Sequence, residues 1–108
     1  MDIENSKAQM RKGVLELCIL AILSKGEKYP SDILEVMTAA ELLVVEGTLY
    51  PLLTRLKNEN LLTYRWEEST SGPPRKYFTL TTDGKKFLKS LSIAYEALND
   101  SVEKILNQ

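Results

Sequence analysis

The sequence has no histidine, a single cysteine and no long apolar run. Without histidine it lacks the commonest metal ligand and general base, and Cys18 alone excludes an internal disulfide. Its apolar runs stay short of the roughly 18 residues that a membrane span requires, and its first residues lack the pattern of a secretory signal. These absences argue against metal sites, cofactors and hydrolytic chemistry, and they predict a cytoplasmic protein that does not contact membranes.

An excess of charge of one sign is also missing. The chain has 14 basic and 15 acidic residues, for a net charge of −1. Such a balance counts against a protein that coats nucleic acid, because non-specific binding grows with the number of phosphates neutralised. Specific DNA binding stays open, since a small domain can keep a basic edge beside an acidic back. At 108 residues, 44% of them hydrophobic, the chain is predicted to form one globular domain.

The N-terminal third is predicted to be helical. Residues 6 to 23 form one long helix in this interpretation, and its apolar run from Leu17 to Leu23 marks the buried end. Gly26 suits the left-handed residue after the last turn. No histidine is present to activate Cys18 within the apolar run, so we interpret it as a structural thiol. A second helix is expected from Pro30, and the apolar tetrad at residues 42–45, which is rich in β-branched residues, predicts a short strand.

Residues 47 to 60 are the most informative stretch. Apolar side chains recur there at helical spacing, at Leu49, Leu52, Leu53 and Leu56. The helix is expected to start near Thr48 as its N-cap, because Pro51 is tolerated in a first turn. Hydrogen-bond donors, cations and a flat ring, which suit phosphates and base edges, occupy the opposite face: Thr48, Tyr50, Pro51, Thr54, Arg55, Lys57 and Asn58. A surface helix whose polar side is merely solvated is the alternative.

A β-hairpin is predicted to follow this helix. Leu62, Tyr64 and Trp66 alternate with polar residues, as in a strand with one buried face, and a second strand runs from residue 76 to 80. The intervening tract, residues 68–74, is dense in turn formers. Arg75 and Lys76 are therefore expected beside the hairpin tip, where they either contact a DNA backbone or serve only as solubilising charges.

The last helix is predicted to run from its N-cap Thr81 to about Leu106. Its apolar residues recur at alternating intervals of three and four, which is a heptad seam: Leu88, Leu91, Tyr95, Leu98, Val102 and Ile105. Such a seam at the end of a small domain predicts contact with a second copy of the chain. Packing against its own core alone is the alternative.

Together these elements predict a mainly α fold with a small β-hairpin, a winged helix-turn-helix plus a C-terminal dimerisation helix. We expect a DNA-binding domain at residues 1–81, including the N-terminal helix, and the dimerisation helix at residues 82–108. In winged helices the third helix enters the major groove and the hairpin touches the adjacent backbone.

Two motifs make the sequence resemble the PadR-type transcriptional regulators, the phenolic-acid decarboxylase repressor family. Residues 46 to 56 resemble the recognition-helix signature of that family, and residues 72 to 78, followed by Leu80, Thr81 and Gly84, resemble its wing. With Gly13, Leu15 and Leu20 the resemblance spans residues 13 to 84, and the short length resembles the subgroup with one C-terminal helix. Pro30 and Asn60 stand where the family usually has glycine, although asparagine tolerates a left-handed conformation.

The resemblance implies a homodimeric repressor rather than an enzyme, bound to duplex DNA and often relieved by a small aromatic or cationic effector. Its two-fold symmetry predicts an inverted-repeat operator. Seven DNA contacts carry over from the family: Thr48, Tyr50, Pro51, Thr54 and Arg55 on the helix, with Arg75 and Lys76 on the wing. Lys7, Arg11 and Lys12 either add phosphate contacts or are solvated.

A ligand pocket at the dimer interface is the last implication, formed by Met10, Leu17 and Tyr95. Tyr95 fits ordinary dimer packing as well, because it lies on the seam. The alternative function for the whole chain is a winged-helix module that binds proteins and not DNA.

Overall fold

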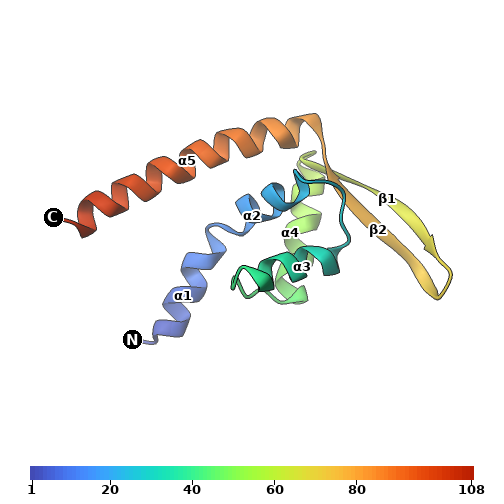
Figure 1. Cartoon of the computed structure of the whole chain (residues 1–108), viewed down its shortest axis with the longest axis horizontal. Helices are drawn as coiled ribbons and strands as arrows, with labels where there is room; N and C mark the ends of the chain where they lie inside the picture. Colours follow the sequence, from blue (N-terminus) through green and yellow to red (C-terminus); the bar gives the residue numbers. More distant parts are fainter.

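Five helices and one antiparallel hairpin follow one another along the chain (Figure 1). The computed structural model describes residues 1–108, with α1 at Ile3–Lys12, α2 at Leu15–Leu23, α3 at Pro30–Ala39 and α4 at Glu46–Asn58. The hairpin consists of β1 (Leu62–Ser69) and β2 (Gly72–Leu80), and α5 (Thr82–Leu106) ends the chain. The predicted fold class, mainly helical with a small hairpin and a long last helix, is therefore confirmed.

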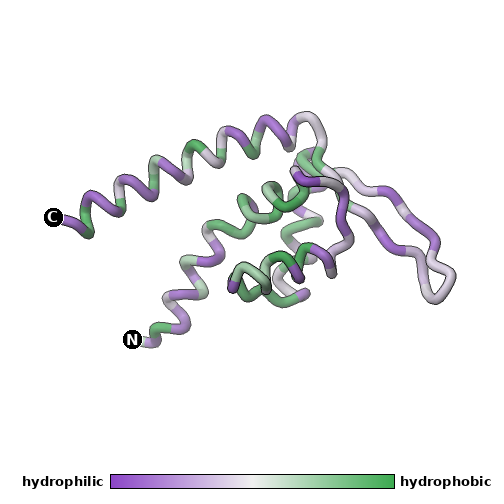
Figure 2. Tube along the Cα trace, in the orientation of Figure 1, coloured by the Kyte–Doolittle hydropathy of each residue, from purple (hydrophilic) through white to green (hydrophobic).

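The core lies where α2, α3, α4 and the base of the hairpin meet. Figure 2 shows that α2 is apolar along most of its length, and both Ile19 and Leu20 are fully buried. The members of this core are Ile19, Leu20, Leu23, Ile33, Met37, Leu49, Leu53, Leu56, Leu61, Leu62, Phe78 and Leu80. Packing of these side chains holds α4 and the hairpin together as one unit.

The expected single helix over residues 6–23 is wrong, because the chain breaks into α1 and α2 at Gly13 and Val14. Gly13 caps α1, with its N–H bonded to the Met10 carbonyl at 3.2 Å. Glycine destabilises the interior of a helix, and the segments before and after Gly13 differ in how far they are buried. α1 has no buried residue, whereas α2 buries Leu15 and three others, so the break lets α2 enter the core alone.

The expected strand at residues 42–45 is also wrong. These residues form an irregular segment after the turn at Glu41, whose φ of 63° lies in the left-handed region. Leu42 and Val44 pack against the core from this segment, with no neighbouring strand to pair with. α4 then begins earlier than predicted, with Val45 rather than Thr48 as its N-cap, so Pro51 lies inside the helix.

The hairpin tip lies farther out than predicted. The strands pair from Leu62 with Leu80 as far as Ser69 with Gly72, so only Thr70 and Ser71 form the tip. Arg75 and Lys76 therefore lie within β2, not beside the tip. Trp66 is 60% exposed, so the predicted buried face of β1 ends near Tyr64, because the outer half of the hairpin extends beyond the core (Figure 1).

Two predicted connections around the hairpin are confirmed. Asn60, between α4 and β1, has a φ of 64°, the left-handed conformation expected of the residue that replaces glycine. Thr81 is the N-cap of α5, and its Oγ1 accepts a hydrogen bond from the Gly84 N–H at 2.9 Å. The same hydroxyl donates to the Asn60 carbonyl at 2.7 Å, which ties the start of α5 to the end of α4.

The first turns of α5 pack against the core, and the rest extends away from it (Figure 1). Gly84 is buried, and a Cβ at this position would lie 2.0 Å from the Leu61 carbonyl oxygen. Leu88 and Leu91 are partly buried against the core. No helix in the chain combines the length and apolar character needed to cross a membrane.

Candidate nucleic-acid interface

The outer face of α4 divides into a free centre and one engaged edge. At roughly 100° per residue, Tyr50, Pro51 and Thr54 share the face opposite the buried leucines, and all three are exposed. None of them has a side-chain hydrogen bond within the chain. The centre of the helix surface is therefore available to a partner.

The engaged edge of α4 contacts neighbouring helices. Arg55 forms an ion pair with Glu16 of α2, and Thr48 is half-buried beside a small cleft that Arg11 and Lys12 of α1 also line. Because of its ion pair, Arg55 can bind a phosphate only if it shares Glu16 with that phosphate or separates from Glu16. On α1, Lys7 pairs with Glu4 at 3.5 Å.

The two wing cations point to opposite faces of the hairpin. Residues directly paired across antiparallel strands share a face, so Lys76 lies with Trp66, and Arg75 lies with Glu67. The Lys76 Nζ is 4.4 Å from the ring centroid of Tyr64 and 5.1 Å from that of Trp66. The Arg75 guanidinium instead lies 5.3 Å from the Tyr29 ring, at the start of α3.

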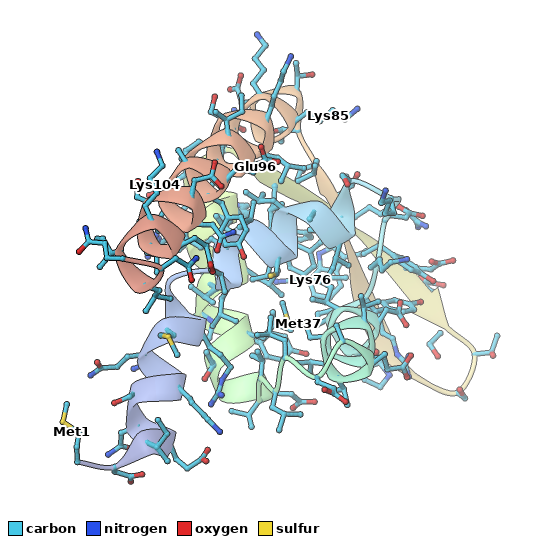
Figure 3. All side chains as sticks on the ribbon, turned by 60° about the vertical axis from the view of Figure 1, so that its left-hand side comes forward. Met1, Met37, Lys76, Lys85, Glu96 and Lys104 are labelled. Atoms are coloured by element: carbon cyan, nitrogen blue, oxygen red, sulfur yellow. The ribbon has the colours of Figure 1, made fainter.

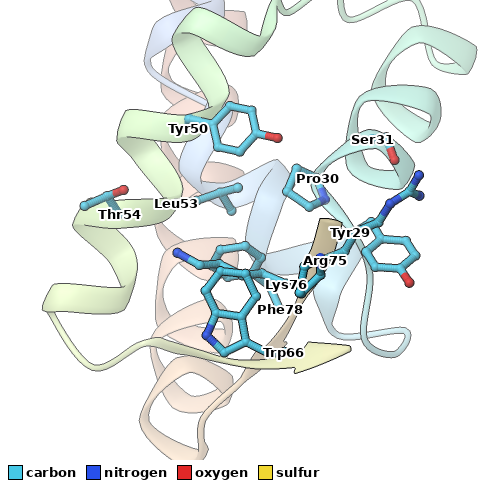
Figure 4. Close-up of a pocket in the computed structure, with 11 residues that line it drawn as sticks. Tyr29, Pro30, Ser31, Tyr50, Leu53, Thr54, Trp66, Arg75, Lys76 and Phe78 are labelled. Atoms are coloured by element: carbon cyan, nitrogen blue, oxygen red, sulfur yellow. The ribbon is translucent and has the colours of Figure 1, made fainter. Parts of the chain in front are cut away.

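A cleft of about 470 Å³ lies between α4, the start of α3 and the hairpin (Figure 4). Its lining combines four aromatic rings, two cations and no carboxylate: Tyr29, Pro30, Ser31, Tyr50, Leu53, Thr54, Trp66, Pro74, Arg75, Lys76 and Phe78. Four of the seven predicted DNA contacts, Tyr50, Thr54, Arg75 and Lys76, meet at this cleft. The sequence analysis missed Tyr29, Ser31 and Trp66 as members, since only the tertiary fold brings them to α4.

The hairpin is fastened to the loop before α3. Arg65 donates to both carboxylate oxygens of Glu27, from Nε at 3.0 Å and from Nη2 at 2.7 Å, and these bonds lower the pKa of Glu27. Lys28 and Phe78 exchange backbone hydrogen bonds at 2.9 and 3.0 Å. Stacking of Tyr29 on Tyr77, with centroids 3.7 Å apart, completes the attachment. No spacing in the sequence indicated this attachment of the hairpin to the segment before α3.

Arg75 and Lys76 have no ion-pair partner, in contrast to Arg55 and Arg65. Glu67, which faces Arg75 across the hairpin, lies 3.3 Å from the Arg65 guanidinium instead. The positive charge of the wing is therefore not neutralised from within the chain. A net charge of −1 thus coexists with a local basic surface next to the free face of α4.

The seam residues of α5 divide by position along the helix. Leu88 and Leu91 are half-buried, whereas Tyr95 is 45% exposed, Leu98 63%, Val102 44% and Ile105 68%. Figure 3 shows the side chains of Lys85, Glu96 and Lys104 spread along the same helix. The chain itself leaves the apolar C-terminal half of this seam uncovered.

The three candidate pocket residues lie on different helices. Met10 is 70% exposed on α1, Leu17 is half-buried on α2 and Tyr95 lies on α5. None of the four main clefts of the chain is lined by any of them. A pocket at this place would need a second copy of the chain.

Cys18 and the acidic side chains offer little site chemistry. Cys18 is half-buried among apolar residues of α2, and desolvation raises the pKa of its thiol, so the nucleophilic thiolate is disfavoured. No three side chains of the metal-binding types gather closely enough to hold an ion.

Three packed helices, the third with a free polar face, and a hairpin beside that face define a winged helix-turn-helix protein. The sequence model of the transcriptional regulator PadR-like family matches residues 19–90 of the chain. The chain therefore belongs to the PadR-like family, whose members are transcriptional regulators and not enzymes.

Solved structures of similar proteins have the same architecture. A PadR-like transcription factor from Bacteroides fragilis is 56% identical, with a TM-score of 0.79 over 94% of this chain and 98% of that one. A PadR-family regulator from Eggerthella lenta is 28% identical, with a TM-score of 0.89 over 96% and 91% of the two chains. PadR of Bacillus subtilis, solved in complex with operator DNA, is 30% identical, with a TM-score of 0.69. The latter match covers 74% of this chain and 47% of the other, so this chain spans about half the length of the Bacillus subtilis protein.

Proposed function

We propose that this transcriptional regulator is a homodimeric repressor that binds an inverted-repeat operator in double-stranded DNA. Residues 1–81 form its DNA-binding unit and residues 82–108 its dimerisation helix. The observation that carries the proposal is the free face of α4, with exposed Tyr50 and Thr54, beside two cations that lack ion-pair partners. The similarity to Bacillus subtilis PadR, which is bound to operator DNA in its structure, supports it.

In this proposal α4 reads the bases and the hairpin holds the backbone. Tyr50, Pro51 and Thr54 enter the major groove, because they form the exposed centre of the helix surface. Arg75 and Lys76 contact phosphates, which fix the register of the protein on the duplex without reading sequence. Thr48 and Arg55 contact the DNA from one edge of the helix, and Arg55 exchanges its ion pair with Glu16 for a phosphate.

The seam of α5 holds the two copies together. The apolar side chains of Leu98, Val102 and Ile105 are exposed to water in a single chain. Packing against the α5 of a second chain buries them. Leu88, Leu91 and Tyr95 extend the same seam toward the core. The dimer then presents two α4 helices to successive major grooves, about 34 Å apart.

An effector, where one acts, is proposed to bind at the dimer interface between Met10, Leu17 and Tyr95. Met10 and Tyr95 are exposed in one chain and lie on the helices that extend away from the core (Figure 1). A small aromatic or cationic molecule fits a site that includes the Tyr95 ring. Binding there would change the separation of the two α4 helices and release the operator.

The salt dependence of duplex binding tests this proposal against a module that binds only proteins. If a dimer neutralises about six phosphates, the logarithm of the affinity falls with the logarithm of the salt concentration at a slope of about −5. Fluorescence anisotropy of a labelled operator, found by genome-wide capture of bound DNA, measures this slope. A slope near zero, or no captured operator, would favour the protein-binding alternative.

A further inference from the structure

The cleft between α4 and the hairpin contains more aromatic surface than a phosphate contact requires. Figure 4 shows Tyr50 of α4 and Trp66 of β1 on opposite sides, with Leu53 between them. Leu53 and Phe78 are buried and form its floor, whereas Tyr50 is 49% exposed and Trp66 60%. Two large rings thus line the same open space, and flat aromatic surfaces of this kind favour a flat ligand.

The charges around this space select an anion. Arg75 and Lys76 line it without an ion-pair partner, and none of the eleven lining residues is acidic. Glu27 and Glu67 both bind Arg65, and Glu68 lines a separate, neighbouring cleft with Trp66, Pro73 and Pro74. An anionic group beside Trp66 would therefore meet the Lys76 ammonium, in a cleft with no acidic lining residue.

We propose that this cleft binds a small flat anion, namely an aromatic ring that carries a carboxylate, sulfonate or phosphate group. The ring stacks between Tyr50 and Trp66, and its anionic group binds Lys76, which lies on the same face of the hairpin as Trp66. The volume of about 470 Å³ lies within the range of small-molecule sites, about 300 to 1,000 Å³. This site lies within one chain and differs in place from the interface pocket of Met10, Leu17 and Tyr95.

Its consequence for regulation rests on the proposed function. Tyr50, Thr54, Arg75 and Lys76 line the cleft and are also the proposed DNA contacts. A ligand in the cleft occupies the surface that the duplex needs, so ligand and operator exclude each other. Release of DNA then requires no change in the dimer.

Trp66 reports on the site directly, because it is the single tryptophan of the chain. We expect 4-nitrobenzenesulfonate, a flat anion that quenches indole fluorescence, to quench Trp66 with a saturable curve in the absence of DNA. The neutral 4-nitrobenzenesulfonamide is the matched control and should bind about tenfold more weakly, since it lacks the charge. Equal affinity for the two compounds, or no saturable quenching by the sulfonate, would overturn the proposal.

Variants locate the bound sulfonate. Lys76→Met keeps an unbranched side chain only one atom shorter and removes its charge, and calorimetry should show a roughly tenfold loss of affinity. Tyr50→Leu should weaken binding as well, whereas Lys85→Met, which removes an exposed charge from α5, should leave it unchanged. If Tyr95→Leu weakened binding and Lys76→Met did not, the ligand would belong to the dimer interface and this assignment would be wrong.

A competition experiment separates the site from the proposed function. The sulfonate should displace labelled operator from the dimer, with an inhibition constant equal to its dissociation constant from the fluorescence titration. Simultaneous binding of ligand and operator would refute the shared surface. A protein that bound the sulfonate but no duplex would refute the repressor proposal and leave the ligand site supported.

Discussion

α4 and α5 have similar apolar repeats, but the chain buries only one of them. Leu49, Leu53 and Leu56 of α4 are fully buried in the core, whereas Leu98 and Ile105 of α5 are more than 60% exposed. The repeats differ in their surroundings and not in their pattern. Helical periodicity therefore identifies which face is apolar, and the tertiary fold decides whether that face meets the same chain or another one.

The largest expected effect comes from a charge in the exposed repeat. Leu98→Glu places a carboxylate at the proposed dimer interface, where burial without a partner is costly. Loss of the tether between half-sites should lower operator affinity by about 10²–10⁴-fold, measured by gel shift. The helical circular dichroism should stay, because one chain does not bury Leu98.

Ala97→Glu is the matched control for this change. Ala97 is exposed on α5 and lies beside Leu98 but off the seam. The Ala97→Glu variant should bind the operator with an affinity within a small factor of that of the unaltered protein. Equal losses for Leu98→Glu and Ala97→Glu would mean that the seam does not determine dimerisation.

Truncation of one leucine in α4 and one in α5 tests whether each apolar repeat is buried within one chain or only in the dimer. Leu53→Ala leaves a cavity in the core and should lower the free energy of unfolding by about 2–5 kcal/mol, at any protein concentration. Leu98→Ala should instead lower stability by an amount that depends on protein concentration, because only the dimer buries this side chain. Urea unfolding at two concentrations checks both, and a concentration-independent effect of Leu98→Ala would place its contacts within one chain.

A smaller effect is expected where α5 meets the core. Gly84→Ala brings a Cβ to 2.0 Å from the Leu61 carbonyl oxygen, so the helix must shift, at a cost of about 1–3 kcal/mol. Gly47→Ala in the first turn of α4 has no atom within 4 Å and should stabilise the helix by roughly 0.5–1 kcal/mol. Thermal unfolding of the two variants should move in opposite directions, and destabilisation by both would contradict the open surface of α4.

Effects of similar size should separate base reading by α4 from backbone contact by the hairpin. Tyr50→Ala and Thr54→Ala should weaken operator binding more than binding to random duplex, by about 1–3 kcal/mol at a base contact. Arg75→Ala and Lys76→Ala should weaken both duplexes alike, as phosphate contacts do. Anisotropy titrations with the two duplexes measure the ratio of operator affinity to random-duplex affinity. If this ratio changed equally in all four variants, α4 and the hairpin would not have separate roles.

Local signals in the sequence predicted most of the elements. Helical spacing predicted α4, the two-residue period predicted β1, and Thr81 predicted the start of α5. The break at Gly13 was missed because glycine is tolerated within helices, and only the different surroundings of α1 and α2 require a break there. The tetrad at residues 42–45 has strand propensity, but it has no strand to pair with.

Part of the candidate interface was also predictable from local patterns in the sequence. The free centre of α4 follows from helical spacing, so Tyr50, Pro51 and Thr54 could be identified from the sequence. The ion pair of Arg55 with Glu16 and the attachment of Arg65 to Glu27 join residues far apart in the chain, which no local pattern indicates. The opposite directions of Arg75 and Lys76 follow from the alternation of side chains along β2, whose extent the turn-forming tract concealed.

Sedimentation equilibrium of the unaltered chain tests most directly whether the exposed repeat of α5 joins two copies. The account predicts a mass of twice the 12.2 kDa of one chain at concentrations that saturate the operator. Leu98→Glu in the same experiment should sediment at the mass of one chain while its circular dichroism stays helical. An unaltered protein that sediments at 12.2 kDa while it binds the operator would contradict the role assigned to α5.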